Sequence, residues 1–170
     1  MTDRMTDPVG QFLALSAELT GFRVVDLQGT GMAQVYYDEV TAIVGERICG
    51  ELWSKSSEIL EKSTAGSNLR AEELDRLVLG DPKLGPVCRS IIKMWYLGTW
   101  AELPPEWRDK HGATARDADH VVSGEAYREG LVWTAIGAHP MGAKQPGFGS
   151  WATEPKVLES TRETMEDTDA

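Results

Sequence analysis

The chain has few cysteines, and this scarcity limits the metal chemistry open to it. Only Cys49 and Cys88 carry thiols among its 170 residues. Two thiols cannot supply the four ligands of an iron–sulfur cluster or a structural zinc ion. Both lie among apolar neighbours, so we expect buried free thiols. A single disulfide between the helices that carry them is the alternative, and only in an oxidising compartment.

Long apolar runs and an excess of positive charge are also missing. No run approaches the roughly 20 apolar residues that span a bilayer, so direct membrane insertion is not expected. The first residues show neither an apolar signal region nor a twin arginine, which places the sequence as given in the cytoplasm. The formal net charge is −10. Such a charge argues against a nucleic-acid partner, because binding phosphates requires clustered Lys and Arg.

Recognisable catalytic motifs are absent as well. The pair Gly29 and Gly31 resembles the start of a dinucleotide fingerprint, but Gln34 stands where the third glycine belongs and no βαβ unit surrounds it. The three histidines form no HExxH pattern, and no serine lies in a GxSxG turn. We therefore expect no catalytic residue, cofactor site or metal site in this chain.

What the chain does contain is helical periodicity over residues 7–100, which predicts a mainly α body of about five helices. The first helix begins at Asp7-Pro8 and ends at Gly21, because Pro suits the first helical position and Gly the last. A break is expected near Gly45. The strongest helix spans Pro86–Trp100, where Trp95 and its neighbours form a broad apolar face.

The pattern changes after Trp100. Residues 101–152 read as an irregular arm rich in Gly, Pro and aromatic residues, which wraps the body or a partner. Within it, Ser123 can cap a short helical turn, and the β-branched stretch Leu131–Ile136 favours an extended conformation. Residues 7–152 thus form one helical domain with a C-terminal arm. Residues 153–170 are acidic and poor in apolar groups, which predicts a disordered tail.

The segment Gly137–Trp151 is the most informative part of the arm. It holds four Gly and two Pro but no acidic residue. Pro140 and Pro146 exclude a regular helix, and the glycines disfavour a strand. The segment nevertheless carries Phe148 and Trp151, and aromatic side chains between Gly and Pro are suited to a protein interface. An interaction protein is therefore favoured over an enzyme.

Several stretches of this sequence are also similar to one known family. They are Phe12–Ser16, Leu19–Gly21, Ile91–Trp100, Ala126–Trp133 and Ala135–Trp151. With them the chain resembles the small subunit of bacterial FAD-dependent sugar and polyol dehydrogenases, of the sorbitol, fructose and glucose dehydrogenase type. The resemblance runs from about Phe12 to Pro155, and its long C-terminal motif is the specific part.

The resemblance implies a non-catalytic accessory subunit without a cofactor. In that family the FAD lies in a large catalytic subunit of the glucose–methanol–choline type, and a cytochrome c subunit often accepts the electrons. The small subunit is needed for the large one to mature, and usually carries it through the Tat pathway to the periplasm. Family members usually begin with a twin-arginine signal, which this sequence lacks, so a periplasmic location is the alternative to a cytoplasmic one.

This reading gives a set of expected partner contacts. Phe148 and Trp151 would be apolar anchors, supported by Tyr96, Trp100 and Trp133. The polar contacts would come from His139, Lys144 and Gln145. Two other readings stay open: a small enzyme with His139 as its acid or base, and a solitary regulatory domain whose arm closes its own core.

Overall fold

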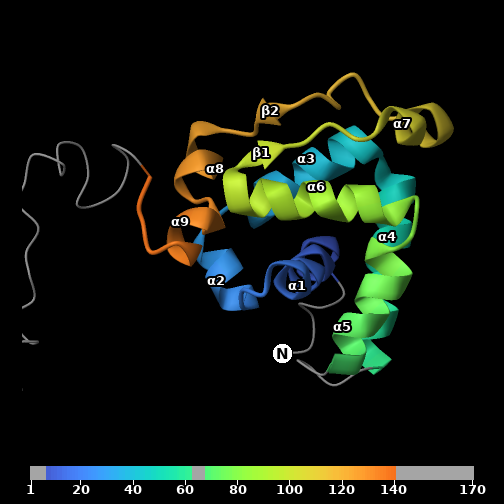
Figure 1. The fold of residues 1–170 in the computed structure, drawn as a ribbon, viewed down its shortest axis with the longest axis horizontal. Helices are drawn as coiled ribbons and strands as arrows, with labels where there is room; N and C mark the ends of the chain where they lie inside the picture. The colour runs from blue at the N-terminus through green and yellow to red at the C-terminus, as the bar shows by residue number, and fades with distance from the viewer. Residues whose placement is uncertain (1–6, 63–67, 141–170) are drawn as a thin grey trace, which may run out of the picture. The chain divides into compact units, whose positions relative to one another are not determined.

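The computed structural model describes residues 7–62 and 68–140, and these residues form a mainly α protein (Figure 1). Residues 7–138 belong to one compact body, while His139 and Pro140 belong to a second unit. The first part of the body holds α1 (Pro8–Thr20), α2 (Val24–Gly29), α3 (Ala33–Val44), α4 (Glu46–Lys62), α5 (Asn68–Leu74) and a π-helical turn (Asp75–Leu79). The second part holds α6 (Leu84–Leu97), β1 (Thr99–Trp100), α7 (Pro105–His111), β2 (His120–Val121), α8 (Gly124–Arg128) and α9 (Leu131–Ala135).

Two helix boundaries confirm the sequence signals. Helix α1 has Pro8 in its first turn and ends at Gly21, whose φ of 76° is left-handed and therefore suits glycine. Gly45, with φ 88°, separates α3 from α4 at the predicted break. The predicted mainly α fold class is thus confirmed, although the described residues contain more helices than the five expected.

The core is built around Trp95 on α6, which is 1% exposed. The ring of Phe12 on α1 stacks on it with centroids 6.0 Å apart, and Tyr36 on α3 meets it edge-on at 4.8 Å. Trp53 on α4 meets Phe12 edge-on, with ring centroids 5.6 Å apart. Aromatic side chains from four helices therefore share one apolar interior, where each buries a large area.

The end of α6 corrects one prediction. The helix stops at Leu97 and does not reach Trp100, because Gly98 takes a left-handed conformation with φ 70°. Trp100 instead lies in β1, which pairs antiparallel with β2 so that Trp100 faces His120 across the two strands. The local apolar pattern continues past Gly98, so periodicity alone could not show where the helix ends.

The described part of the predicted arm is also not irregular. Residues 105–111, 124–128 and 131–135 are helical, and Leu103, Trp107 and Leu131 are buried in the same core as the body. The expectation of an extended stretch over Leu131–Ile136 is wrong, since this stretch contains α9. Burial of Leu131 against the core outweighs the weak β preference of the branched residues of α9. The rest of the arm and the acidic tail lie outside the described residues.

The Ser123 prediction is confirmed. Its hydroxyl oxygen accepts a hydrogen bond of 2.9 Å from the backbone N–H of Ala126 at the start of α8. Among residues 7–62 and 68–140, no helix has both the length and the apolar character needed to cross a membrane.

A buried carboxylate ties the segment after α7 to β1. Asp117 Oδ1 accepts 2.8 Å from the indole N–H of Trp100 and 3.1 Å from the backbone N–H of Leu103. Trp100 and Leu103 are each 1% exposed. Because their N–H groups are shielded from water, burying them without an acceptor would be destabilising, and the Asp117 carboxylate supplies that acceptor.

Replacing Asp117 with Ala should destabilise the protein by about 2 kcal/mol or more, because two buried N–H donors lose their acceptor. Asp117→Asn should cost less, since its side-chain oxygen can still accept both bonds. Asp119→Ala is the matched control: Asp119 accepts one exposed backbone bond from Glu102. Urea unfolding measures all three, and equal losses for Asp117→Ala and Asp119→Ala would contradict this account.

Candidate protein-interaction surface

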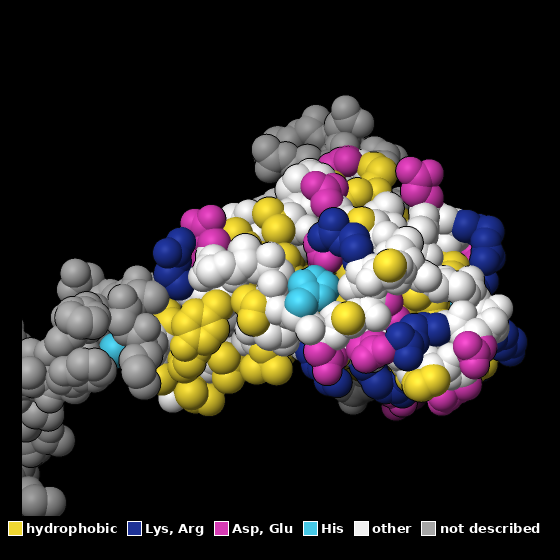
Figure 2. Space-filling view, turned by 90° about the horizontal axis from the view of Figure 1, so that it is seen from above, with side chains coloured by type: hydrophobic (Ala, Val, Ile, Leu, Met, Phe, Trp, Pro, Cys, Tyr) yellow, Lys and Arg dark blue, Asp and Glu magenta, His cyan; other side chains and the backbone are white. Residues whose placement is uncertain are grey.

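Apolar side chains gather where α8 and α9 meet the end of α6. We call Leu97, Tyr127, Trp133 and Ile136 the α8–α9 surface. Leu97, Tyr127 and Ile136 are 47%, 40% and 64% exposed, while Trp133 is half-buried. Figure 2 shows hydrophobic side chains clustered on this end of the body. Exposed apolar groups scattered singly are ordinary, but a group of them around an aromatic pair is typical of a protein contact site.

The aromatic pair at its centre is held in a defined geometry. The rings of Tyr127 and Trp133 meet edge-to-face with centroids 5.5 Å apart. The Trp133 indole N–H donates 2.9 Å to the backbone carbonyl of Tyr127. Because its polar group is already satisfied, Trp133 presents a fixed apolar ring edge and loses little side-chain entropy on binding.

Two glycines let α8 and α9 approach α6 closely. A Cβ on Gly98 would lie 2.5 Å from the carbonyl oxygen of Ala126, and a Cβ on Gly130 would lie 2.8 Å from that of Tyr96. Both distances are shorter than van der Waals contact, so the backbones could not come this close with any side chain there. This contact positions the α8–α9 surface on the body.

Tyr96 anchors the end of α6, next to the α8–α9 surface. Its hydroxyl donates 2.9 Å to the backbone carbonyl of Thr20, and its ring meets Phe22 edge-on at 6.1 Å. The half-buried Tyr96 therefore links the end of α6 to the connection between α1 and α2.

The structure brings together only some of the residues that the sequence singled out. Tyr96 and Trp133 both lie where α6 meets the start of α9: the Tyr96 carbonyl approaches Gly130, whose own carbonyl accepts 3.2 Å from the Trp133 backbone N–H. Trp100 is inside the core, so it can support a surface only indirectly. His139 lies in the second unit, where its Nδ1 is 3.4 Å from the Pro140 carbonyl oxygen. Four predicted contacts lie outside the described residues: Lys144, Gln145, Phe148 and Trp151.

Sequence reasoning missed Leu97, Tyr127 and Ile136 as surface residues. Leu97 continues the apolar pattern of α6 and therefore resembles a core position. Tyr127 falls in the short helical turn predicted after Ser123, and Ile136 in the stretch expected to be extended, but neither prediction says which side chains are exposed. Exposure depends on tertiary packing.

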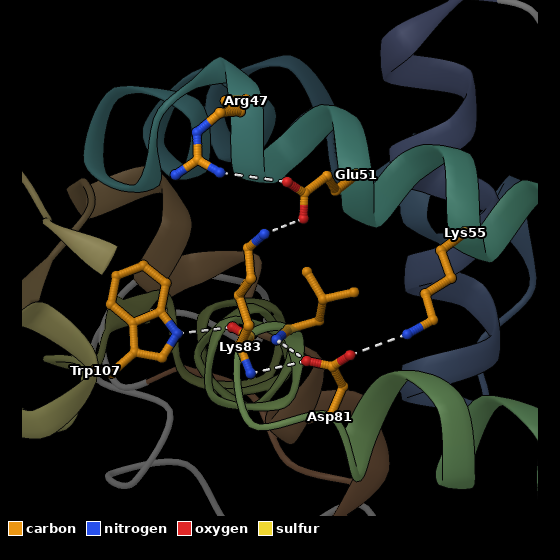
Figure 3. Close-up of polar contacts among 7 residues, drawn as sticks. Arg47, Glu51, Lys55, Asp81, Lys83 and Trp107 are labelled. Carbon is orange, nitrogen blue, oxygen red and sulfur yellow. Dashed lines mark hydrogen bonds and ion pairs between the residues drawn. The ribbon is translucent and has the colours of Figure 1, made fainter. Parts of the chain in front are cut away.

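A second candidate site is the charged cluster where α4 passes the start of α6 (Figure 3). Lys55 Nζ lies 2.9 Å from Asp81 Oδ2, and Arg47 lies 3.3 Å from Glu51. Lys83 also pairs with Glu51. An adjoining groove of about 500 Å³ runs past these side chains. Every charged side chain of the cluster already pairs with one of opposite sign, Arg47 and Lys83 sharing Glu51, so the ion pairs fasten α4 to the turn before α6.

Asp81 shows that this cluster is structural. Burial pushes its pKa upward, but hydrogen bonds from Lys55 and from the backbone N–H groups of Leu84 and Lys83 outweigh burial and lower the pKa overall. Its Oδ1 accepts from those two N–H groups at 3.1 and 2.8 Å, which caps the start of α6. The Trp107 indole donates 2.7 Å to the Lys83 carbonyl and fixes the same turn.

The two histidines of the body already have partners. His111 packs on the ring of Trp107 with centroids 5.2 Å apart. Both ring nitrogens of His120 already contact oxygen atoms, of Ala118 and Glu39. Within the part of the chain that the structure describes, no group of three or more His, Cys, Asp or Glu side chains could hold a metal ion. Gly29 is the last residue of α2 and Gly31 lies between α2 and α3, so neither follows a strand.

The two cysteines are free and buried, as predicted. Burial raises the pKa of the Cys49 thiol to about 11 and that of the Cys88 thiol to about 12. A thiol that resists ionisation is a poor nucleophile, so both side chains act as small apolar core groups.

No protein-family model, curated protein or solved structure matches this chain.

Gly130→Ala should destabilise the protein by about 1–3 kcal/mol, because the new methyl group would press on the Tyr96 carbonyl. Alanine tolerates the backbone at this position, where φ is −54°, so the effect is steric. Gly124→Ala is the control, since nothing lies within 4 Å of its Cβ. Urea unfolding should show Gly124→Ala equal to the parent or slightly more stable. A loss as large as that of Gly130→Ala would contradict the close packing.

The native protein should react with a thiol reagent at about pH 8 roughly 100-fold more slowly than the unfolded chain, because the thiolate fraction falls tenfold for each unit of pKa increase. Because burial raises the pKa of both thiols, the protonated thiols contribute to the stability of the folded state. This contribution is complete below the ordinary thiol pKa and is lost as pH rises toward 11–12. The labelling rate is measured from the absorbance of the chromophore that the thiol reagent releases. Rapid labelling of either thiol in the folded protein would contradict their burial.

Proposed function

We propose that this chain is the non-catalytic small subunit of a FAD-dependent sugar or polyol dehydrogenase. In this role it binds, stabilises and helps to mature a large FAD-containing catalytic subunit of the glucose–methanol–choline type. A cytochrome c subunit that accepts electrons from the flavin is a further member of the proposed complex. The chemistry belongs to the large subunit, and this chain supplies a docking surface.

The observation that carries the proposal is the α8–α9 surface. It directly precedes Gly137–Trp151, the segment with the specific resemblance to the small-subunit family. Its aromatic pair is preorganised by the Trp133–Tyr127 hydrogen bond, and preorganised aromatic groups are frequent energetic centres of interfaces. Described histidines and cysteines, in contrast, are occupied or buried.

A docking surface can stabilise the partner through mass action alone. Any protein that binds only the folded form of its partner lowers the unfolded fraction in proportion to its concentration and affinity. An apolar surface on the large subunit would also be covered by this contact, which reduces its tendency to aggregate. This explains how a chain without a cofactor can support maturation of a flavoprotein.

Co-expression with a large flavoprotein encoded beside this chain is the direct test. The proposal expects the two chains to co-purify with bound FAD, seen as flavin absorbance, and expects less soluble flavoprotein when this chain is omitted. If the flavoprotein is equally soluble and equally loaded with FAD without this chain, the proposed function is wrong.

Ile136→Asp should weaken the complex about tenfold or more, because a charge would be placed in an apolar contact. Leu69→Asp is the matched control. Leu69 is 70% exposed, and it lies on α5, away from α8 and α9 (Figure 1). Titration of each purified variant into the flavoprotein measures the affinity. Equal weakening by both variants, or none by Ile136→Asp, would exclude the α8–α9 surface as the contact.

A further inference from the structure

A cavity of about 300 Å³ lies where α1, α3 and α4 meet. Helix α1 lines it with Gln11, α3 with Tyr37, and α4 with residues that run from the core to the surface. Of these, Trp53 is 4% exposed, whereas Glu46 and Gly50 are exposed. The cavity therefore opens to solvent and ends against the aromatic core, and its volume suits a small ligand.

Gly50 leaves space in this cavity without a backbone reason to be glycine. It lies inside α4, where glycine is less stable than alanine because it has more freedom to lose on folding. Its φ is not left-handed, and a Cβ there would meet no atom of the described neighbours within 4 Å. Gly98 and Gly130, in contrast, each lie against a carbonyl oxygen. Since Gly50 lines the cavity, a larger residue at this position would narrow it.

The cavity also holds a carboxylate without a partner. Among residues 7–62 and 68–140, Glu46 makes no ion pair and no hydrogen bond through its side chain. Burial raises the pKa of the Cys49 thiol, and the charge of Glu46 raises it further, so this carboxylate lies near the buried part of the cavity. None of the described residues that line the cavity is Lys, Arg or His. The negative charge of Glu46 is therefore not compensated within the lining.

Aromatic rings stand beside this carboxylate. Tyr37 and Trp53 both line the cavity, with ring centroids 6.2 Å apart and planes inclined by 34°. The face of such a ring attracts a cation, and its apolar surface also binds hydrocarbon. Gln11 and Ser54 add side-chain oxygens that can accept hydrogen bonds.

Together these groups select an organic cation. An ammonium group donates hydrogen bonds only, and a carboxylate accepts only, so the two are complementary. An anion would be repelled by Glu46, and a neutral polyol would leave Glu46 without an opposite charge. The formal net charge of −10 favours the approach of cations to the protein in general.

We propose that this cavity binds a small alkylammonium ligand. The ammonium group pairs with Glu46, and the hydrocarbon part lies against the rings of Tyr37 and Trp53. Helix α4 lies at the other end of the body from α8 and α9 (Figure 1). The inference is therefore independent of the partner that the α8–α9 surface binds.

The test titrates n-butylammonium into the full chain and follows nitrogen-15 spectra. The signals of the Trp53 indole N–H and the Gly50 amide should shift and saturate. The affinity should be about tenfold higher than for neutral 1-butanol, because butanol lacks the charge that Glu46 and the rings attract. Equal affinity for the two compounds, or tighter binding of glycerol, would overturn the proposal.

A charge variant tests the role of the carboxylate. Glu46→Gln should lower the affinity for n-butylammonium about tenfold, because it removes the counter-charge and keeps the size of the side chain. Glu61→Gln is the matched control, since it removes one negative charge from an exposed position of α4 outside the cavity. Equal effects of the two variants would mean that only the overall charge attracts the amine, which contradicts a site at Glu46.

A pair of glycine variants tests the space. Gly50→Leu should abolish the saturable shift of the Trp53 signal, because its side chain fills the cavity. Gly50→Ala should unfold in urea at the same concentration as the parent or a higher one, since its methyl group enters open space and alanine is the better helix former. Unchanged binding by Gly50→Leu, or a loss of stability in Gly50→Ala, would contradict the cavity.

Blocked lysine distinguishes a free amine from a lysine side chain of a protein. Nα-acetyl-lysine amide carries the same alkylammonium group on a peptide backbone, and it should bind no more tightly than n-butylammonium. If it binds more tightly, the cavity receives a lysine side chain and the proposed small amine is wrong.

Discussion

The close approach of α8 and α9 to the end of α6 is the constraint on which the interaction surface depends. It needs glycine at two positions, because a Cβ on Gly98 or Gly130 would overlap a backbone carbonyl. The same left-handed Gly98 ends α6 and turns the chain into β1. One small residue thus stops the central helix, starts the two-stranded pairing and makes room for α8.

Polar contacts hold residues 99–123 against the helical core. Asp117 satisfies two buried donors at Trp100 and Leu103, and Glu39 connects α3 to Arg116 and His120. These contacts join residues distant in sequence and leave few buried groups of this region unpaired. The helical core around Trp95 supplies the apolar burial, while the polar contacts determine where residues 99–123 lie on it.

The sequence predicts the helical core well and the C-terminal part poorly, for physical reasons. Pro8, Gly21, Gly45 and Ser123 act through local backbone geometry, so their effects can be read without tertiary information. The burial of Leu103, Trp107 and Leu131 depends on contacts with distant helices, and local composition suggested an arm instead. Of the candidate site, Trp133 was already among the partner contacts expected with the resemblance, whereas Leu97 and Ile136 required the packed structure.

We propose that this chain acts by binding a large flavoprotein through the α8–α9 surface. Hydrogen exchange of the chain, alone and in the complex, tests it most directly, because exchange maps the contact without altering any residue. Binding through this surface should add protection at the amides of residues 124–137 and leave exchange in α4 and α5 unchanged. Protection confined to α4 and α5, with none in α8 and α9, would contradict it.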